Sequence, residues 1–194
     1  MCEFSPVKAR ALLDLHGYVD RDGDGWREQP DGNPLVLRKA GTASQLERRR
    51  HELWKRALDA VGLRIEFDIA TWPQLLNKSR AGSLMMWGYQ WAAASPDGGF
   101  FLAIAYGPNA GEANDPRFEL PAFDRLFERQ RSLPDGAVRD DVIRQAKNLL
   151  AAYMPYKVHM HNVLPLLVQP WTRNYWRHPF MRDQWRFIDT DRSQ

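Results

Sequence analysis

The chain has 194 residues, of which 44% are hydrophobic and 26% charged, proportions that are ordinary for a folded domain with its own core. No apolar run approaches the length of a membrane span, and the net charge of +3 with mixed signs predicts no nucleic-acid partner. Cys2 is the only cysteine, which excludes a disulfide within the chain and leaves the choice between cytoplasm and periplasm open.

The first residues predict a helix followed by an acidic turn. Ser5 and Pro6 are typical of a helix start, because a hydroxyl caps the first amides and proline fits the first helical position. Gly17 is expected to end this helix in the left-handed conformation. A turn rich in Asp and Gly follows at residues 20–25, and the mostly apolar residues 35–38 predict a strand.

Residues 44–80 predict a helix, a strand and a second, shorter helix. Ser44 and Glu47 have the spacing of a capping box, in which two side chains satisfy free amides at the helix start. The helix should end at Gly62, and the apolar stripe expected on it consists of Leu46, Leu53, Trp54, Ala57, Leu58 and Val61. The three arginines at 48–50 are expected to face mostly solvent. Alternation at residues 63–69 predicts a half-buried strand, and Thr71 can cap the helix that follows.

An apolar run of strand length at residues 84–91 is followed by a loop of small and turn-forming residues. Trp87, Tyr89 and Trp91 fall at every second position, so in a strand all three side chains lean to one face. Such a face, ending in a loop with exposed amides, can form one wall of a ligand cleft. Taken residue by residue, burial in the core is the simpler interpretation.

The C-terminal half predicts two helices and an aromatic tail. Apolar residues at helical spacing follow Pro121 and, after a turn at 134–136, continue in a second helix to Tyr153. Residues 158–168 are strand-like, and residues 171–187 are rich in Trp and Arg without clear periodicity. Strands that alternate with helices place the chain in the α/β class.

Several landmarks occur in an order that resembles one protein family. They are the helix start at 5–14, the turn at 17–25, the residues Asp-Gly-Asn-Pro-Leu at 31–35, the helix–Gly–strand unit at 53–67, the loop that begins at Trp91, and residues 156–171. Together they resemble the C-terminal lobe of the family 5 extracellular solute-binding proteins, which are the peptide, nickel and haem-type receptors of ABC importers. The resemblance covers nearly the whole chain.

The resemblance implies one lobe of a type II periplasmic-binding-protein-like fold, with a mixed sheet flanked by helices and the N-terminal lobe absent. It assigns residues 1–170 to the C-terminal lobe and residues 171–194 to a tail that would pack near the missing lobe. In that family two lobes close on a solute, which the receptor delivers to a permease. The implied partners are a peptide or other small solute, the transmembrane permease subunits and the N-terminal lobe of a longer parent protein. The implied location of the parent is the periplasm, although residues 1–6 lack the features of a signal peptide.

The loop after Trp91 matches the family only in part. The family typically has Trp, two small residues, Asp, an aromatic residue and Pro-Asp-Pro, whereas here Ala94 replaces the acid and Ser95 the aromatic residue. In peptide receptors of the family that acid pairs with the free amino terminus of the ligand, so Ala94 argues against a linear peptide held in this way. Asp97 can either replace the missing acid or cap the turn. The expected ligand-binding residues are Tyr89, Trp91, Ala94, Ser95 and Asp97.

Two groups of residues have a pattern that is compatible with a metal ion. Asp20, Asp22 and Asp24 match the first ligand positions of an EF-hand calcium loop, but its closing position falls on Asp31, where such loops use glutamate. A solvated turn is the default interpretation. His159 and His161 alternate on one strand face, without an identifiable third ligand.

The sequence favours a binding protein over an enzyme. Cys2 has no paired base, and neither a Gly-x-Ser-x-Gly motif nor a phosphate loop occurs, so no catalytic residue and no cofactor are expected. The alternative function is a truncated interaction module that binds another protein through the exposed cleft or the tail.

Overall fold

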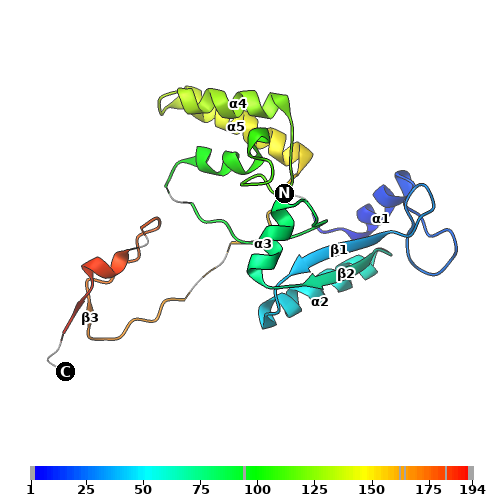
Figure 1. Ribbon diagram of the computed structural model, residues 1–194, viewed down its shortest axis with the longest axis horizontal. Helices are drawn as coiled ribbons and strands as arrows, with labels where there is room; N and C mark the ends of the chain where they lie inside the picture. The colour runs from blue at the N-terminus through cyan, green and yellow to red at the C-terminus, as the bar shows by residue number, and fades with distance from the viewer. Residues whose placement is uncertain (1–2, 94, 162, 164, 182, 192–194) are drawn as a thin grey trace. The chain divides into compact units, whose positions relative to one another are not determined.

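The computed structural model describes residues 3–93, 95–161, 163, 165–181 and 183–191. The chain folds into two compact units, Met1–Gln90 and Trp91–Gln194, whose helices and strands are labelled in Figure 1. None of the described helices is long and apolar enough to cross a membrane. The division expected between residues 170 and 171 lies within the second unit and stays a prediction.

The first unit is built around a parallel pair of strands (Figure 1). Its elements are α1 (Pro6–Leu15), β1 (Val36–Gly41), α2 (Gln45–Asp59), β2 (Arg64–Ile69) and α3 (Trp72–Arg80). The two strands pair from Val36 opposite Arg64 to Gly41 opposite Ile69. Because parallel strands need a crossover connection, α2 links β1 to β2, and it packs against β2.

The helices of this unit begin at the predicted caps. The hydroxyl of Ser5 accepts a hydrogen bond from Lys8 N at 3.3 Å, and that of Ser44 accepts one from Glu47 N at 3.1 Å. Gly17 has a φ of +81°, the left-handed helix end that was predicted. The second hydrogen bond predicted for this capping box, from the Ser44 amide to the Glu47 side chain, is wrong. The Ser44 amide donates to the carbonyl of Thr42, and the Glu47 carboxylate lies toward Lys39 of β1.

The apolar stripe predicted for α2 is wrong at Leu46 and Leu53, which are mostly exposed. The buried residue of this helix is His51, whose ring stacks on Phe67 of β2 with 4.1 Å between centroids. The face of α2 that meets the sheet is therefore partly polar, and Lys39 of β1 is itself buried. Periodicity of apolar residues alone does not reveal such a face.

The strand predicted at residues 84–91 is reduced to one bridge. Met86 pairs with Lys39 of β1, and its carbonyl and amide bond to the two neighbours of Lys39 at 2.8 and 3.1 Å. The residues after Met86 leave the ladder, since the rings of Trp87 and Tyr89 pack on Trp72 instead of extending the sheet.

The second unit packs two helices against a short helical segment. Its elements are the 3₁₀ helices η1 (Gly98–Ala105) and η2 (Gly107–Asn109), the helices α4 (Pro121–Ser132) and α5 (Ala137–Tyr153), and, further on, β3 (Thr172–Arg173), η3 (Gln184–Phe187) and β4 (Asp189–Thr190). The helices predicted after Pro121 and after the turn at 134–136 are therefore confirmed. A buried core cluster consists of Leu102, Ala105, Phe123, Phe127 and Ala146.

The C-terminal segment of this unit has little regular structure. β3 and β4 form a two-residue antiparallel ladder. The strand-like run predicted at residues 158–168 forms no strand in its described residues, because a strand requires an adjacent strand to accept and donate its backbone hydrogen bonds. Many apolar side chains of this segment, including Val163 and Leu167, are exposed.

Replacing Phe123 by Ala should destabilise the second unit. Phe123 is fully buried where α4 meets α5 and η1, so the variant loses apolar contacts and gains a cavity, at a cost of about 3–5 kcal/mol in unfolding free energy. Val138→Ala on the exposed side of α5 is the control and should cost less than about 0.5 kcal/mol. Urea unfolding followed by circular dichroism measures both, and equal midpoints for the two variants would contradict this core.

Candidate functional site

Three aromatic rings gather in the first unit. Trp72 lies in the first turn of α3, and Trp87 and Tyr89 follow the bridge at Met86. The ring centroids are 5.2 Å apart between Trp72 and Trp87, 5.4 Å between Trp72 and Tyr89, and 4.6 Å between Trp87 and Tyr89. Trp72 is 46% exposed, so this aromatic cluster keeps a face toward solvent.

A cavity of about 160 Å³ adjoins the aromatic cluster. Its lining residues are Gly41, Thr42, Glu47, Arg50, Trp72, Trp87, Gly88 and Tyr89. Gly41 and Thr42 lie at the carboxyl end of β1, the end at which open α/β sheets bind their ligands. An apolar, aromatic lining with a few polar groups is also typical of a small-molecule site. We therefore treat this cavity as the candidate solute site.

A larger hollow of about 380 Å³ lies elsewhere on the first unit. Its lining residues are Val36, Arg38, Ala40, Asp68, Ser83, Leu84, Met85 and Met86. It contains no aromatic ring, and it lies along β1 rather than at its carboxyl end. The smaller cavity is the better candidate because aromatic and convergent polar groups meet there.

The carboxylate of Glu47 anchors the polar side of the candidate site. Arg50 Nη1 donates to Glu47 Oε1 at 2.5 Å, while Lys39 Nζ and His51 Nε2 lie 3.8 and 3.7 Å from Glu47 Oε2. The side chains of Lys39, Glu47 and His51 are all largely buried. Glu47 and Arg50 thus line the cavity, and Lys39 and His51 lie against Glu47 without lining it.

Burial lowers the pKa of two members of this cluster. It lowers the pKa of Lys39 and outweighs the opposing effect of Glu47, and the charge of Arg50 lowers this pKa further. Burial also lowers the pKa of His51, with a smaller contribution in the same direction from Lys39 and an opposing one from Glu47. His51 Nε2 is buried without a hydrogen-bond partner among the described residues. We conclude that His51 is held as a neutral imidazole.

The residues predicted to bind the solute divide between the two units. Tyr89 lines the candidate cavity in the first unit. Trp91 and Ser95 are half-buried and lie in the second unit, while Ala94 falls outside the described residues. A ligand-binding role for these residues stays a prediction.

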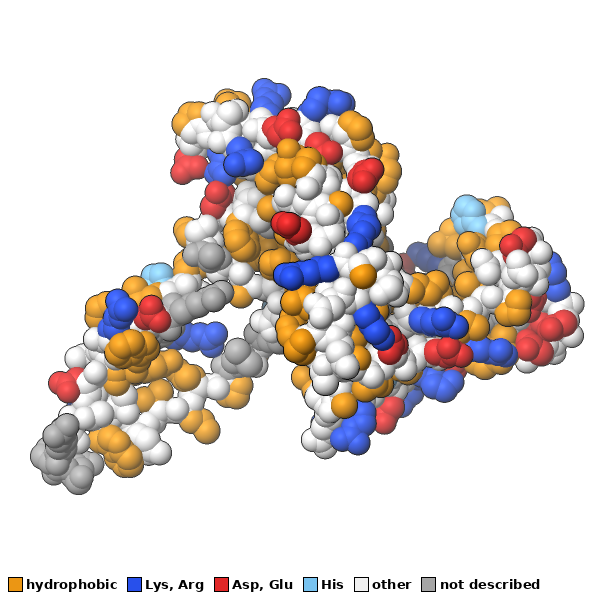
Figure 2. Space-filling view, in the orientation of Figure 1, with side chains coloured by type: hydrophobic (Ala, Val, Ile, Leu, Met, Phe, Trp, Pro, Cys, Tyr) orange, Lys and Arg blue, Asp and Glu red, His pale blue; other side chains and the backbone are white. Residues whose placement is uncertain are grey.

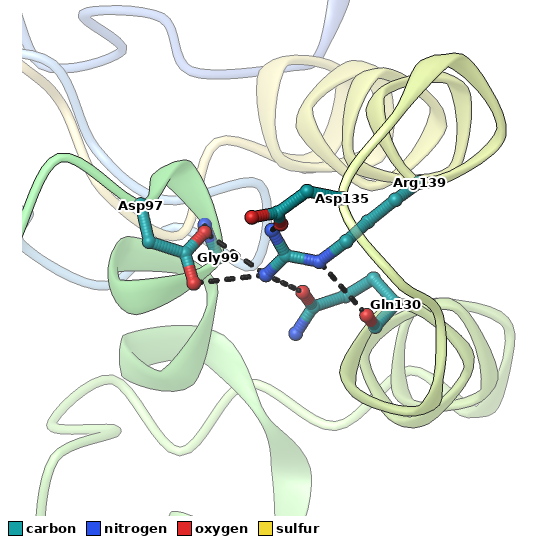
Figure 3. A network of polar contacts seen from close by, with 5 residues as sticks. All are labelled: Asp97, Gly99, Gln130, Asp135 and Arg139. Carbon is teal, nitrogen blue, oxygen red and sulfur yellow. Dashed lines mark hydrogen bonds and ion pairs between the residues drawn. The ribbon is translucent and has the colours of Figure 1, made fainter.

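Asp97 has a structural role that the structure shows directly (Figure 3). Its Oδ1 accepts a hydrogen bond from Gly99 N at 2.9 Å at the start of η1, and its two oxygens accept from Arg139 Nη2 of α5 at 2.9 and 2.8 Å. Arg139 also donates to Asp135, to the Gln130 carbonyl and to Gln130 Oε1 at 2.9–3.0 Å. The hydrogen bonds from Arg139 are the main cause that lowers the pKa of Asp97. This carboxylate thus ties η1 to α5.

The acidic turn brings four carboxylates together. Ligand oxygens of Asp20, Asp22, Asp24 and Glu28 all lie within 4.8 Å of one another. Asp31, the predicted closing residue, instead accepts hydrogen bonds from the amide and side chain of Asn33. Asp20 accepts from the amides of Gly23 and Gly25, as expected of a solvated turn that closes on itself. The solvated turn stays the default interpretation, and calcium binding stays the less favoured alternative.

Sequence reasoning missed Trp72, Glu47 and Arg50 as lining residues of a site. The run of three arginines predicts side chains that face mostly solvent, and of the three Arg48 and Arg49 are exposed whereas Arg50 is half-buried. Glu47 was assigned to a cap, although its spacing of three from Arg50 could have indicated an ion pair on one helix face. Trp72 carried no signal of its own, because its role depends on Trp87, which is distant in the sequence.

Replacing Asp97 by Asn should destabilise the second unit at neutral pH. The variant loses the charge that pairs with Arg139, and because Asp97 is partly exposed the cost should be only about 1 kcal/mol. The lowered pKa of Asp97 means that its contribution is present above about pH 4 and is lost as the pH falls through the folded-state pKa. Urea unfolding at several pH values tests this, with Asp141→Asn, which removes an exposed pair with Arg144, as the control. Equal effects of the two variants would contradict the role of Asp97.

Replacing His51 by Leu should remove a pH dependence from the stability of the first unit. The lowered pKa of His51 means that below about pH 6.5 the unfolded chain binds a proton that the folded chain does not, so stability falls as the solution becomes more acidic. A leucine side chain at this position cannot titrate and leaves no unpaired nitrogen. Hydrogen exchange of β2 amides between neutral and mildly acidic pH measures the difference. Identical pH profiles for the wild type and His51→Leu would show that His51 is not held neutral.

The comparisons with known proteins agree with this fold. The profile of a family described as bacterial extracellular solute-binding proteins, family 5 Middle, matches residues 2–113. One similar structure is the periplasmic oligopeptide-binding protein of an oligopeptide ABC transporter from Thermotoga maritima, with bound mannohexaose. The two sequences are 18% identical and the TM-score is 0.70, and the alignment covers 78% of this chain and 30% of the Thermotoga chain. NikA from Brucella suis with Fe(III)-EDTA is 20% identical with a TM-score of 0.65, and the alignment covers 76% of this chain and 30% of NikA. The oligopeptide-binding protein AppA from Bacillus subtilis with a nonapeptide is 18% identical with a TM-score of 0.67, and the alignment covers 77% of this chain and 30% of AppA. No curated protein matches the chain.

The chain therefore spans only about 30% of the length of the solved structures that it resembles. At this identity the likeness shows the fold, and it confirms the expected α/β architecture of a type II periplasmic binding protein. The profile covers more than half of the 194 residues. The chain belongs to the family of bacterial extracellular solute-binding proteins, family 5.

Proposed function

We propose that this chain is the solute-binding part of an ABC importer receptor and that it holds a small solute in the cavity at the carboxyl end of β1. The observation that carries the proposal is that three aromatic rings and an ion pair converge on this one cavity. The rings would supply apolar contact area. The Thr42 hydroxyl and the backbone of Gly88 would supply directional hydrogen bonds.

The size of the cavity supports a site that is completed by further residues. Small-molecule sites usually enclose about 300–1,000 Å³, whereas this cavity measures about 160 Å³. The structures that resemble this chain are roughly three times as long as the part that aligns with it. In this proposal an N-terminal lobe closes over the solute by a hinge motion and supplies the opposite wall, and the closed receptor docks on a permease.

The relatives support a binding role rather than a catalytic one. The Thermotoga and Bacillus proteins are oligopeptide-binding proteins, and their bound ligands are mannohexaose and a nonapeptide. These ligands belong to those proteins and do not identify the solute of this chain. The periplasmic location of the parent protein is part of the same proposal, because the similar Thermotoga protein is a periplasmic binding protein.

A second candidate function is supported by the exposed C-terminal segment. Val158, Val163, Leu167, Trp176 and Trp185 are all strongly exposed there, and Figure 2 shows hydrophobic side chains along this part of the chain. Clustered apolar exposure of this kind marks protein interaction sites. In this alternative the segment binds another protein, with or without a solute.

Removing an aromatic ring from the cavity should weaken solute binding. Saturation-transfer NMR of the chain with amino acids, dipeptides and monosaccharides should detect weak binding, with dissociation constants of about 1 mM, because one open wall buries only part of a solute. Trp72→Ala should lower the affinity about tenfold, since it removes a large contact surface. Trp176→Ala, which changes an exposed tryptophan outside the cavity, is the control and should change nothing.

Three results would contradict parts of this proposal. Equal binding by wild type and Trp72→Ala would contradict the location of the site. Sub-micromolar affinity of the chain by itself would contradict the need for a second lobe. A native pull-down that recovers a stable protein partner, independently of solute, would favour the interaction module.

A further inference from the structure

The polar wall of the candidate cavity carries more positive than negative charge. One carboxylate, that of Glu47, faces two cations, Arg50 and Lys39, and the neutral imidazole of His51. At neutral pH the formal charges of these four groups therefore sum to plus one. The side chains of Lys39, Glu47 and His51 are largely buried, so solvent screens this charge less than it would at the surface.

Lys39 is the group whose charge is least compensated. Its residue is only 8% exposed, and its ammonium lies 3.8 Å from Glu47, beyond hydrogen-bond distance. The other oxygen of Glu47 is already engaged by Arg50. Because a buried cation is stable only with good partners, a further anion close to this wall would be favourable.

The three rings of the aromatic cluster leave no space between them for a cation. A cation binds over the face of a ring, within about 6 Å of its centroid. Here the three centroids are 4.6–5.4 Å apart, so the rings contact one another and leave no space between them for an ammonium group. The cluster instead provides a continuous apolar surface beside the charged wall.

We propose that the solute held in this cavity carries an anionic group, of the carboxylate class, on a flat or apolar body. The anion lies on the Arg50 side of the cavity, where the guanidinium donates to it and the charge of Lys39 acts through the wall. The apolar body packs on Trp72, Trp87 and Tyr89. This inference rests on the proposed function, because it names the solute class of the same site.

Three matched ligands test the charge preference. Phenylacetate, phenylacetamide and 2-phenylethylamine share a ring and differ in charge, and saturation-transfer NMR of the full chain at neutral pH and low salt measures their binding at millimolar concentrations. Phenylacetate should bind about tenfold more tightly than phenylacetamide, since a charge-assisted hydrogen bond replaces a neutral one. The amine should bind most weakly, because it meets the same positive wall.

Variants of the wall separate charge from shape. Lys39→Met removes one positive charge without changing a lining residue, and Arg50→Gln removes the lining cation itself. Each should bring the affinity for phenylacetate close to that for phenylacetamide and leave the amide unaffected. Lys55→Met removes an exposed charge from the same helix and should preserve the preference. Circular dichroism confirms that each variant is folded, and Arg50→Gln provides the test if Lys39→Met does not fold.

The outcomes distinguish this inference from the proposed function. Equal binding of phenylacetate and phenylacetamide, or a preference for the amine, would overturn the anionic solute and leave a solute site in place. A preference for phenylacetate that survives both Lys39→Met and Arg50→Gln would also overturn it. No binding of any of the three ligands would overturn both the inference and the cavity as the solute site.

Discussion

The contact between Lys39 of β1 and Glu47 of α2 constrains the assembly of the first unit. A crossover helix usually covers a parallel strand pair with apolar side chains, but α2 presents a carboxylate to a buried ammonium 3.8 Å away. Loss of Glu47 would leave the buried ammonium of Lys39 without its anion, which costs about 3–5 kcal/mol. The pair therefore fixes which face of α2 meets the sheet and, through Arg50 one turn further on, which groups reach the cavity.

Gly41 connects the packing of α2 with access to the site. A Cβ at this position would lie 2.7 Å from His51 Nε2, closer than real contacts allow, so the imidazole can approach β1 only because this residue is glycine. The missing side chain also leaves the backbone at the end of β1 in the cavity wall. One small residue thus serves both the stacking of His51 on Phe67 and the shape of the cavity.

Local sequence signals predicted local structure correctly, but they could not predict contacts between residues that are far apart in the sequence. The cap at Ser5 and the left-handed Gly17 depend on hydrogen bonds within a few residues, and both are confirmed. The bonds between Asp97 and Arg139 join residues 42 positions apart. A Pro-Asp-Gly turn has the same sequence whether its carboxylate binds a solute or pairs with an arginine of a later helix. The structural role of Asp97 could therefore be recognised only from the folded structure.

The location of the cavity follows from where the ladder on β1 ends. The alternation of Trp87, Tyr89 and Trp91 predicts one shared face only while the chain continues as a strand. Pairing stops at Met86, so contacts with Trp72 decide the orientation of the next rings, and Trp87 and Tyr89 line the cavity. Every lining residue precedes residue 90 and belongs to the first unit. The geometry of the candidate site is therefore set within that unit, by the helices α2 and α3, the end of β1 and the segment that leaves the sheet.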